Sequence, residues 1–213
     1  MIVPATSLVK RHLFAFPVGG RGDFLSSILF GNKLNKCFDQ NEVWWPVDDS
    51  SQMMKIHQWG SCEYSGELIT AENLPTLDVD SWIVIAPTFQ ETFESAYLNW
   101  YKKFRVNDTI QVNDLHALVC LTDSFNDQVG SHQHLFDHVI NFKDLFDLEH
   151  IQNLYRQIRH EELDINSVTR IKYNIDLNQR ILKTCPFDHH GWRDFAANTP
   201  NDQIFFLMNA NEP

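Results

Sequence analysis

The residues best suited to hold a ligand lie in the stretch "FPVGGRGDFLSSILFG", at positions 16–31. An apolar run enters it, glycines and an arginine occupy its middle, and an apolar run with helical spacing leaves it. Glycines allow backbone N–H groups to converge on an anion, and the amino end of a helix carries partial positive charge. The pattern predicts a phosphate-binding turn between a strand and a helix, built from Gly19, Gly20, Arg21, Gly22, Ser26 and Ser27.

The same stretch also fits a tight turn that binds nothing. It matches neither GxxxxGK[ST] nor GxGxxG, the two common nucleotide-binding patterns. Asp23 is expected to cap the following helix, because an aspartate there accepts hydrogen bonds from the first helical N–H groups. A capping carboxylate would occupy the groups that an anion needs, so both interpretations stay open.

A second group of reactive side chains is the histidine cluster in "SHQHLFDH", at positions 131–138. Two histidines at i and i+2 can share a metal ion in an extended segment. The cluster is similar to the HxHxDH motif of metallo-β-lactamase-like hydrolases, with one residue too many before Asp137. A metal-dependent hydrolase built on His132, His134 and His138 is one hypothesis. A polar loop that leads into a strand is the simpler one, and we expect no bound metal.

Other polar groups give weaker indications. Cys185 and His189 could form a thiol–imidazole pair, although their spacing alone says little. His57 and Trp59 could line the mouth of a pocket or pin down a loop by aromatic packing. The sequence has no GxSxG nucleophile elbow.

Apolar runs of strand length recur along the chain and predict a buried parallel sheet. The middle runs are almost continuously apolar, which is typical of strands buried on both faces. The runs are "HLFAF" (12–16), "SWIVIAPT" (81–88), "HALVCLT" (116–122), "HVINF" (138–142) and "IFFLM" (204–208). Cys120, inside the third run, is expected to be buried.

Stretches with apolar residues at three- and four-residue steps alternate with these runs and predict helices. They cover the residues after the glycines and the ranges 91–104, 144–158 and 164–182. This alternation indicates an α/β fold, with a parallel sheet flanked by helices. Residues 1–213 are expected to form a single α/β domain. Its polar, poorly periodic range 40–78 is expected to be an irregular insertion or cap.

Composition and charge narrow the function classes. The chain has a formal net charge of −11, which disfavours nucleic-acid binding because such binding relies on basic residues. No stretch approaches the roughly 18 consecutive apolar residues of a membrane span, and the first residues lack the order of a secretory signal. The cysteines are widely spaced, which fits a reducing compartment. We expect a cytoplasmic protein without nucleic-acid or membrane partners, and homo-oligomer formation stays open.

The segment "FDHVINFKDLFDLEHIQNLYRQI" adds a second motif, in which a strand ends in an aromatic residue and "KDLF" and an amphipathic helix follow. This corner resembles the "YEDL" strand-to-helix corner of the sulfotransferase family. Taken with "FPVGGRGDFLSSIL" near the amino terminus, it makes the ranges 10–40 and 80–160 resemble a small, divergent sulfotransferase-like P-loop protein.

The resemblance implies a donor, an acceptor and a set of site residues. The donor is 3′-phosphoadenosine 5′-phosphosulfate, from which a sulfuryl group would pass to the hydroxyl of a small molecule or a glycan. Glu91 is the candidate general base beyond the second predicted strand. The loop after the first strand would hold the 5′ phosphate through Gly20, Arg21, Gly22 and Ser26. The backbone amides of residues 19–24, which include Gly19, Asp23 and Phe24, would add to this grip, although Asp23 and Phe24 replace the family's usual small hydroxyl residues.

The second phosphate grip departs from the family's pattern. The family usually places an arginine at a strand end and a serine eight residues later, and here Asp123 and Ser131 hold these positions. An aspartate repels a phosphate, so a catalytically inactive interaction protein on the same scaffold is the alternative hypothesis. Its partner surface would use exposed tryptophans such as Trp44, Trp45 and Trp59.

Overall fold

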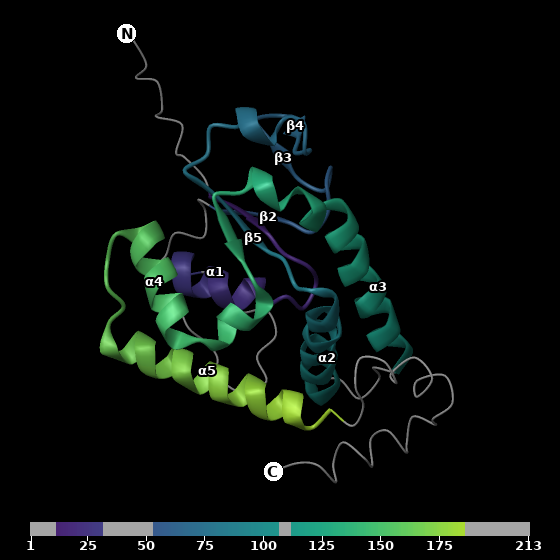
Figure 1. The fold of residues 1–213 in the computed structure, drawn as a ribbon, viewed down its shortest axis with the longest axis vertical. Helices are drawn as coiled ribbons and strands as arrows, with labels where there is room; N and C mark the ends of the chain where they lie inside the picture. The colour runs from purple at the N-terminus through teal and green to yellow at the C-terminus, as the bar shows by residue number, and fades with distance from the viewer. Residues whose placement is uncertain (1–11, 32–52, 107–111, 186–213) are drawn as a thin grey trace.

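A parallel four-stranded sheet forms the centre of the protein in a computed structural model that describes residues 12–31, 53–106 and 112–185 (Figure 1). Its strands, in spatial order, are β2, β1, β5 and β6, and each pairs in parallel with its neighbour. The predicted α/β fold with a parallel sheet and flanking helices is therefore confirmed. The strand bounds are β1 His12–Ala15, β2 Met53–Ile56, β5 Ser81–Ile85 and β6 His138–Ile140.

Alternate residues of the strands supply two different cores, because successive side chains of a strand point to opposite faces. Phe14, Ile83 and Ile85 pack in one cluster with apolar residues of three helices. These helices are α1 Gly22–Phe30, α4 Leu148–Arg159 and α5 Ile165–Lys183. Figure 1 shows α1, α4 and α5 together on one side of the sheet.

The opposite face of the sheet is covered by the carboxyl end of α3, Val112–Gln128, and by Ile69 and Leu74 of the segment after β2. Leu13 and Val84 belong to the same cluster as Phe125 and Val129, at the carboxyl end of that helix. A third cluster joins α2, Phe89–Val106, to α3, α5 and Phe142, the first residue after β6 with a buried side chain. Helix α2 therefore stands at the carboxyl end of the strands, where Figure 1 shows it beside α3.

The range 116–122 is part of α3, so the prediction of a strand there was wrong. The buried residues of this region lie three or four apart, as on one face of a helix. They are Leu115, Leu118, Val119, Thr122 and Phe125. Cys120 lies between them on the outer face and is exposed, so its predicted burial was also wrong.

Part of the range 40–78 joins the sheet, although the sequence predicted an irregular insertion. Strand β2 takes the edge beside β1, with Lys55 opposite Phe14. A short hairpin follows, made of β3 Glu63–Tyr64 and β4 Glu67–Leu68, and then the 3-10 turn η3 Leu74–Thr76. The single-domain prediction for 1–213 stays a prediction, and the predicted strand 204–208 lies outside the described residues. Among the described helices, none is long and apolar enough to cross a membrane.

Candidate functional site

The glycine loop lies where the strand order reverses. From β1 the chain continues to β2 on one side and later to β5 on the other, so the order switches between β1 and β5. In open parallel sheets, ligands bind beyond the carboxyl ends of the strands at such a switch point. Residues 16–21 leave β1 there, and residues 86–88 leave β5 beside them.

Close packing surrounds all three loop glycines, and a Cβ on Gly20 would lie 2.8 Å from the ring of Pro17. A Cβ on Gly19, where φ is +93°, would lie 2.7 Å from the carbonyl oxygen of Ser95 in α2. A Cβ on Gly22 would lie 2.1 Å from the ring of Phe16. The turn itself is closed by the N–H of Gly20, which donates to Pro17 O at 2.9 Å. The loop is thus packed tightly against α2 and against the end of β1.

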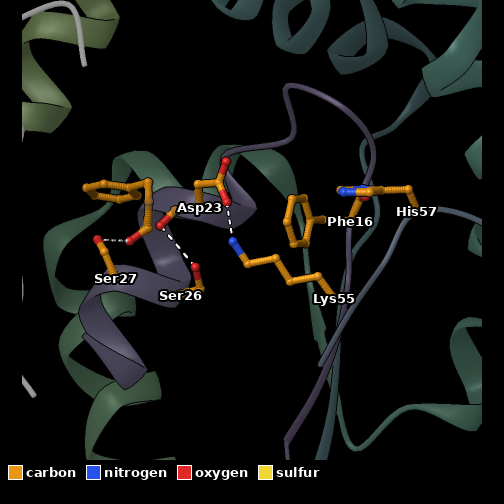
Figure 2. Close-up of polar contacts among 7 residues, drawn as sticks. Phe16, Asp23, Ser26, Ser27, Lys55 and His57 are labelled. Carbon is orange, nitrogen blue, oxygen red and sulfur yellow. Dashed lines mark hydrogen bonds and ion pairs between the residues drawn. The ribbon is translucent and has the colours of Figure 1, made fainter. Parts of the chain in front are cut away.

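Helix α1 begins at this loop without a side-chain cap. Its N-cap residue is Arg21, in the left-handed conformation with φ 60°, and the Arg21 side chain makes no capping hydrogen bond. Asp23 was predicted to cap the helix, and that prediction was wrong. Its carboxylate instead forms an ion pair with the ammonium of Lys55, which reaches across from β2 (Figure 2).

The serines of the first turn bond to the backbone of the same helix. Ser26 Oγ donates to Asp23 O at 3.1 Å, and Ser27 Oγ donates to Phe24 O at 2.7 Å (Figure 2). Both residues are fully buried. Lys55 is the additional basic group that sequence reasoning missed, because nothing in "MMKI" shows that this edge strand lies beside the glycine loop.

The Arg21 side chain is enclosed between two aromatic rings. Its guanidinium carbon lies 4.0 Å from the centroid of Phe24 and 4.3 Å from that of Phe146. Arg21 is only 8% exposed, so these cation–π contacts are shielded from water. Phe146 ends the 3-10 segment η5, Phe142–Phe146, which is the predicted "KDLF" corner after β6. The two motifs that carried the sulfotransferase resemblance therefore touch each other.

Glu91, the candidate base, lies in the first turn of α2 and is 2% exposed. Its Oε2 accepts a hydrogen bond from the Thr88 N–H at 2.8 Å, and the Glu91 N–H donates to Thr88 Oγ1 at 3.3 Å. These two bonds form a capping box, which stabilises the start of a helix. Glu91 thus lies next to the switch point with its carboxylate engaged by the backbone.

Asp123 and Ser131 line the same cavity, together with residues at the end of β5 and the start of α2. Ser131 Oγ donates to the carbonyl oxygen of Asp127 at 2.9 Å, in the turn that leads from α3 into η4, Gly130–Leu135. The eight-residue spacing in the sequence thus corresponds to two residues, Asp123 and Ser131, that line one cavity. Asp127 also lines this cavity.

The histidine cluster does not form a metal site within the described part of the chain. His132 Nδ1 lies 2.7 Å from Gln128 O, the carbonyl that also accepts from Trp59 Nε1 at 2.9 Å. Trp59 stacks on Phe136 and contacts His132 edge-on, so aromatic packing holds the loop that contains Trp59 in place. His189, Trp44 and Trp45 lie outside the described residues.

Comparisons with known proteins give no family for this chain. It matches no protein-family model, and no curated protein or solved structure is significantly similar to it.

Proposed function

We propose that this protein binds the phosphate group of a nucleotide-like donor at the amino end of α1. We propose further that the donor is 3′-phosphoadenosine 5′-phosphosulfate, used for sulfuryl transfer to a hydroxyl acceptor on a sulfotransferase-like P-loop scaffold. One observation carries the proposal: α1 begins uncapped at the switch point between β1 and β5. By contrast, Asp147 caps α4 and Asp164 caps α5.

The electrostatics at this helix end favour an anion. The first backbone bond of α1 runs from the Leu25 N–H to Arg21 O at 3.0 Å. The N–H groups of the residues just before Leu25 point out of the helix end, where the helix dipole is positive. Lys55 adds a full positive charge beside them, and the anion would share it with Asp23.

Glu91 is the proposed general base for the acceptor hydroxyl. To accept a proton it must release the Thr88 N–H or use its other carboxylate oxygen. Glu91→Gln separates the two roles, because glutamine also serves in a capping box but cannot act as a base. We expect Glu91→Gln to keep the stability of the fold and to lose transfer of radioactive sulfate from the donor to a hydroxyl acceptor. Unchanged transfer by this variant would remove Glu91 from the mechanism.

Calorimetric titration with adenosine 3′,5′-bisphosphate tests donor binding. We expect saturable binding that weakens about tenfold in Lys55→Met, a loss of about 1.4 kcal/mol. Lys143→Met is the matched control, because Lys143 is an exposed lysine of η5, which follows β6 at the edge of the sheet opposite β2. If millimolar ligand produces neither heat nor a shift in Tm, the donor-binding proposal is wrong.

A non-enzymatic interaction protein is the second candidate. The observation in its favour is the pairing of Asp23 with Lys55, which offsets positive charge at the end of α1. The same titration discriminates between the two candidates. Absence of anion binding by a folded protein would favour the interaction protein.

A further inference from the structure

Helix α3 carries a thiol and an imidazole side by side on its outer face. His116 and Cys120 are four residues apart, so they lie on the same side of the helix, and both are exposed. The Cys120 sulfur lies 3.8 Å from His116 Nδ1 and 3.9 Å from His116 Nε2. Neither residue belongs to the site proposed at the α1 end.

The buried side of α3 fixes the backbone beneath this pair. Leu115, Leu118 and Val119 come from the same two turns and are buried in the core cluster that joins α3 to α2 and α5. Because the backbone is anchored, only side-chain rotation is needed to adjust the Cys120 sulfur and a ring nitrogen of His116 relative to each other.

The spacing of the two donor atoms is close to the spacing that one metal ion requires. Thiolate and imidazole together suit Zn²⁺, which binds sulfur at about 2.3 Å and nitrogen at about 2.0–2.1 Å in a tetrahedral arrangement. These bond lengths place sulfur and nitrogen about 3.6 Å apart. A ligating histidine uses one ring nitrogen and commonly keeps a hydrogen bond on the other, so the further interaction of His116 is compatible with a role as ligand.

Two ligands leave a tetrahedral zinc site half complete. Within the part of the chain that the structure describes, no group of three or more His, Cys, Asp or Glu side chains is placed to hold a metal ion. A two-fold symmetric contact between two α3 helices would supply His116 and Cys120 a second time. The result is two sulfurs and two nitrogens, the ligand set of structural Cys₂His₂ sites.

The surface beside the pair fits a contact between two copies. Ala117 and Leu121 each follow one of the two ligands and are exposed, so they form an apolar stripe next to the pair. Leu121 is 52% exposed, and it is one of four exposed large hydrophobic residues in the described ranges. A second copy of α3 would cover this stripe. Because each chain has a formal net charge of −11, two copies repel each other and the contact needs a cation.

We propose that α3 forms half of a zinc site, which two copies of this chain complete with His116 and Cys120 of each copy. Each Cys120 thiol releases its proton to solvent and binds the metal as a thiolate. The site does not depend on the proposal for α1, because it uses none of the same residues.

Sedimentation velocity of the full chain tests the proposal, with Zn²⁺ alone as the probe, no affinity tag and a reducing buffer. We expect the mass to double at one Zn²⁺ per two chains and to return when a chelator is added. His116→Gln and Cys120→Ser should each lose this doubling at the zinc concentration that saturates the wild type. Cys62→Ser is the matched control, because Cys62 is a partly exposed thiol of the segment after β2, and it should double like the wild type.

Three results would overturn the proposal. The first is an unchanged mass with equimolar Zn²⁺. The second is doubling that persists in both His116→Gln and Cys120→Ser, which would place the metal elsewhere. The third is calorimetric binding of one Zn²⁺ per chain without a change in mass, which would show that a single copy completes the site. Because both ligands are exposed, the two variants should keep the metal-free Tm of the wild type.

Discussion

Arg21 and Phe146 connect the glycine loop to the corner after β6: the guanidinium carbon lies 4.3 Å from the centroid of the Phe146 ring. Phe24 covers the same guanidinium from α1, with its centroid at 4.0 Å. The charged side chain of Arg21 is therefore packed between α1 and η5. Its contribution to stability can be measured separately from any ligand binding.

Replacing Arg21 should destabilise the fold without any ligand present. Cation–π contacts that are shielded from water contribute up to about 2 kcal/mol. We expect Arg21→Ala to lower the free energy of unfolding by about 1–3 kcal/mol. Arg21→Lys should recover only part of this loss, because an ammonium does not stack as a planar guanidinium does. Urea denaturation measures both variants, and equal stability of the wild type and Arg21→Ala would contradict the packing described.

Gly22 is expected to tolerate no side chain. An added Cβ would lie 2.1 Å from the ring of Phe16, which is itself buried in the main core. Gly22→Ala should therefore lower the free energy of unfolding by about 3 kcal/mol or more, as severe overpacking does. Gly66→Ala is the control, because its Cβ would meet nothing within 4 Å. The control should cost only about 1 kcal/mol, from its positive φ, and a similar loss in both variants would refute the steric explanation.

The ion pair between Lys55 and Asp23 should contribute little to stability. Its side chains are 24% and 41% exposed, so solvent and salt screen the interaction. We expect a double-mutant cycle with Lys55→Met and Asp23→Asn to give a coupling of about 0.2–1 kcal/mol that falls as salt rises. A large coupling that does not depend on salt would mean that the pair is buried. Because the pair is weak, an incoming anion can interact with Lys55 at little cost in the free energy of the ion pair.

Acid should weaken the start of α5. Hydrogen bonds from the Ser167 hydroxyl and the Ser167 N–H hold the pKa of Asp164 below its ordinary value. A lowered pKa in the folded state stabilises the protein above the unfolded pKa of about 3.9, and this stabilisation is lost as pH falls below it. Asp164→Asn keeps a capping oxygen without the titration. Its stability relative to wild type should therefore rise as the pH is lowered below about 4, and a constant difference from pH 7 to pH 3 would contradict the assignment.

The sequence predicted the sheet better than it predicted the surroundings of the site. Continuous apolar runs revealed β1 and β5, because each of these strands is buried on both faces. An apolar run also marked β6, although Val139 of this edge strand is exposed. The same criterion failed for α3, where exposed Cys120 and Leu121 stand among core residues and make the run look like a strand. An edge strand as short as β2 gave no clear signal, so Lys55 could not be assigned to the site.

The contacts of the candidate site depend on residues that are distant in the sequence. No local pattern shows that Phe146 would enclose Arg21 or that Lys55 would pair with Asp23. The spacing of Asp123 and Ser131 did identify two residues that line one cavity, but no local pattern showed that Pro87 and Thr92 would line it too. The glycine turn and the helices α1, α2, α4 and α5 were therefore predictable, and the contacts that tertiary packing creates were not.

The most direct test of the central claim is an amide NMR titration of the full chain with adenosine 3′,5′-bisphosphate. The account predicts saturable shifts at the backbone amides of Gly22, Asp23 and Phe24, because these N–H groups would meet the phosphate at the uncapped start of α1. The shifts should be weaker in Lys55→Met at the same ligand concentration. Saturable binding that leaves these three amides unmoved, or no binding at all, would contradict the claim that the α1 end is an anion site.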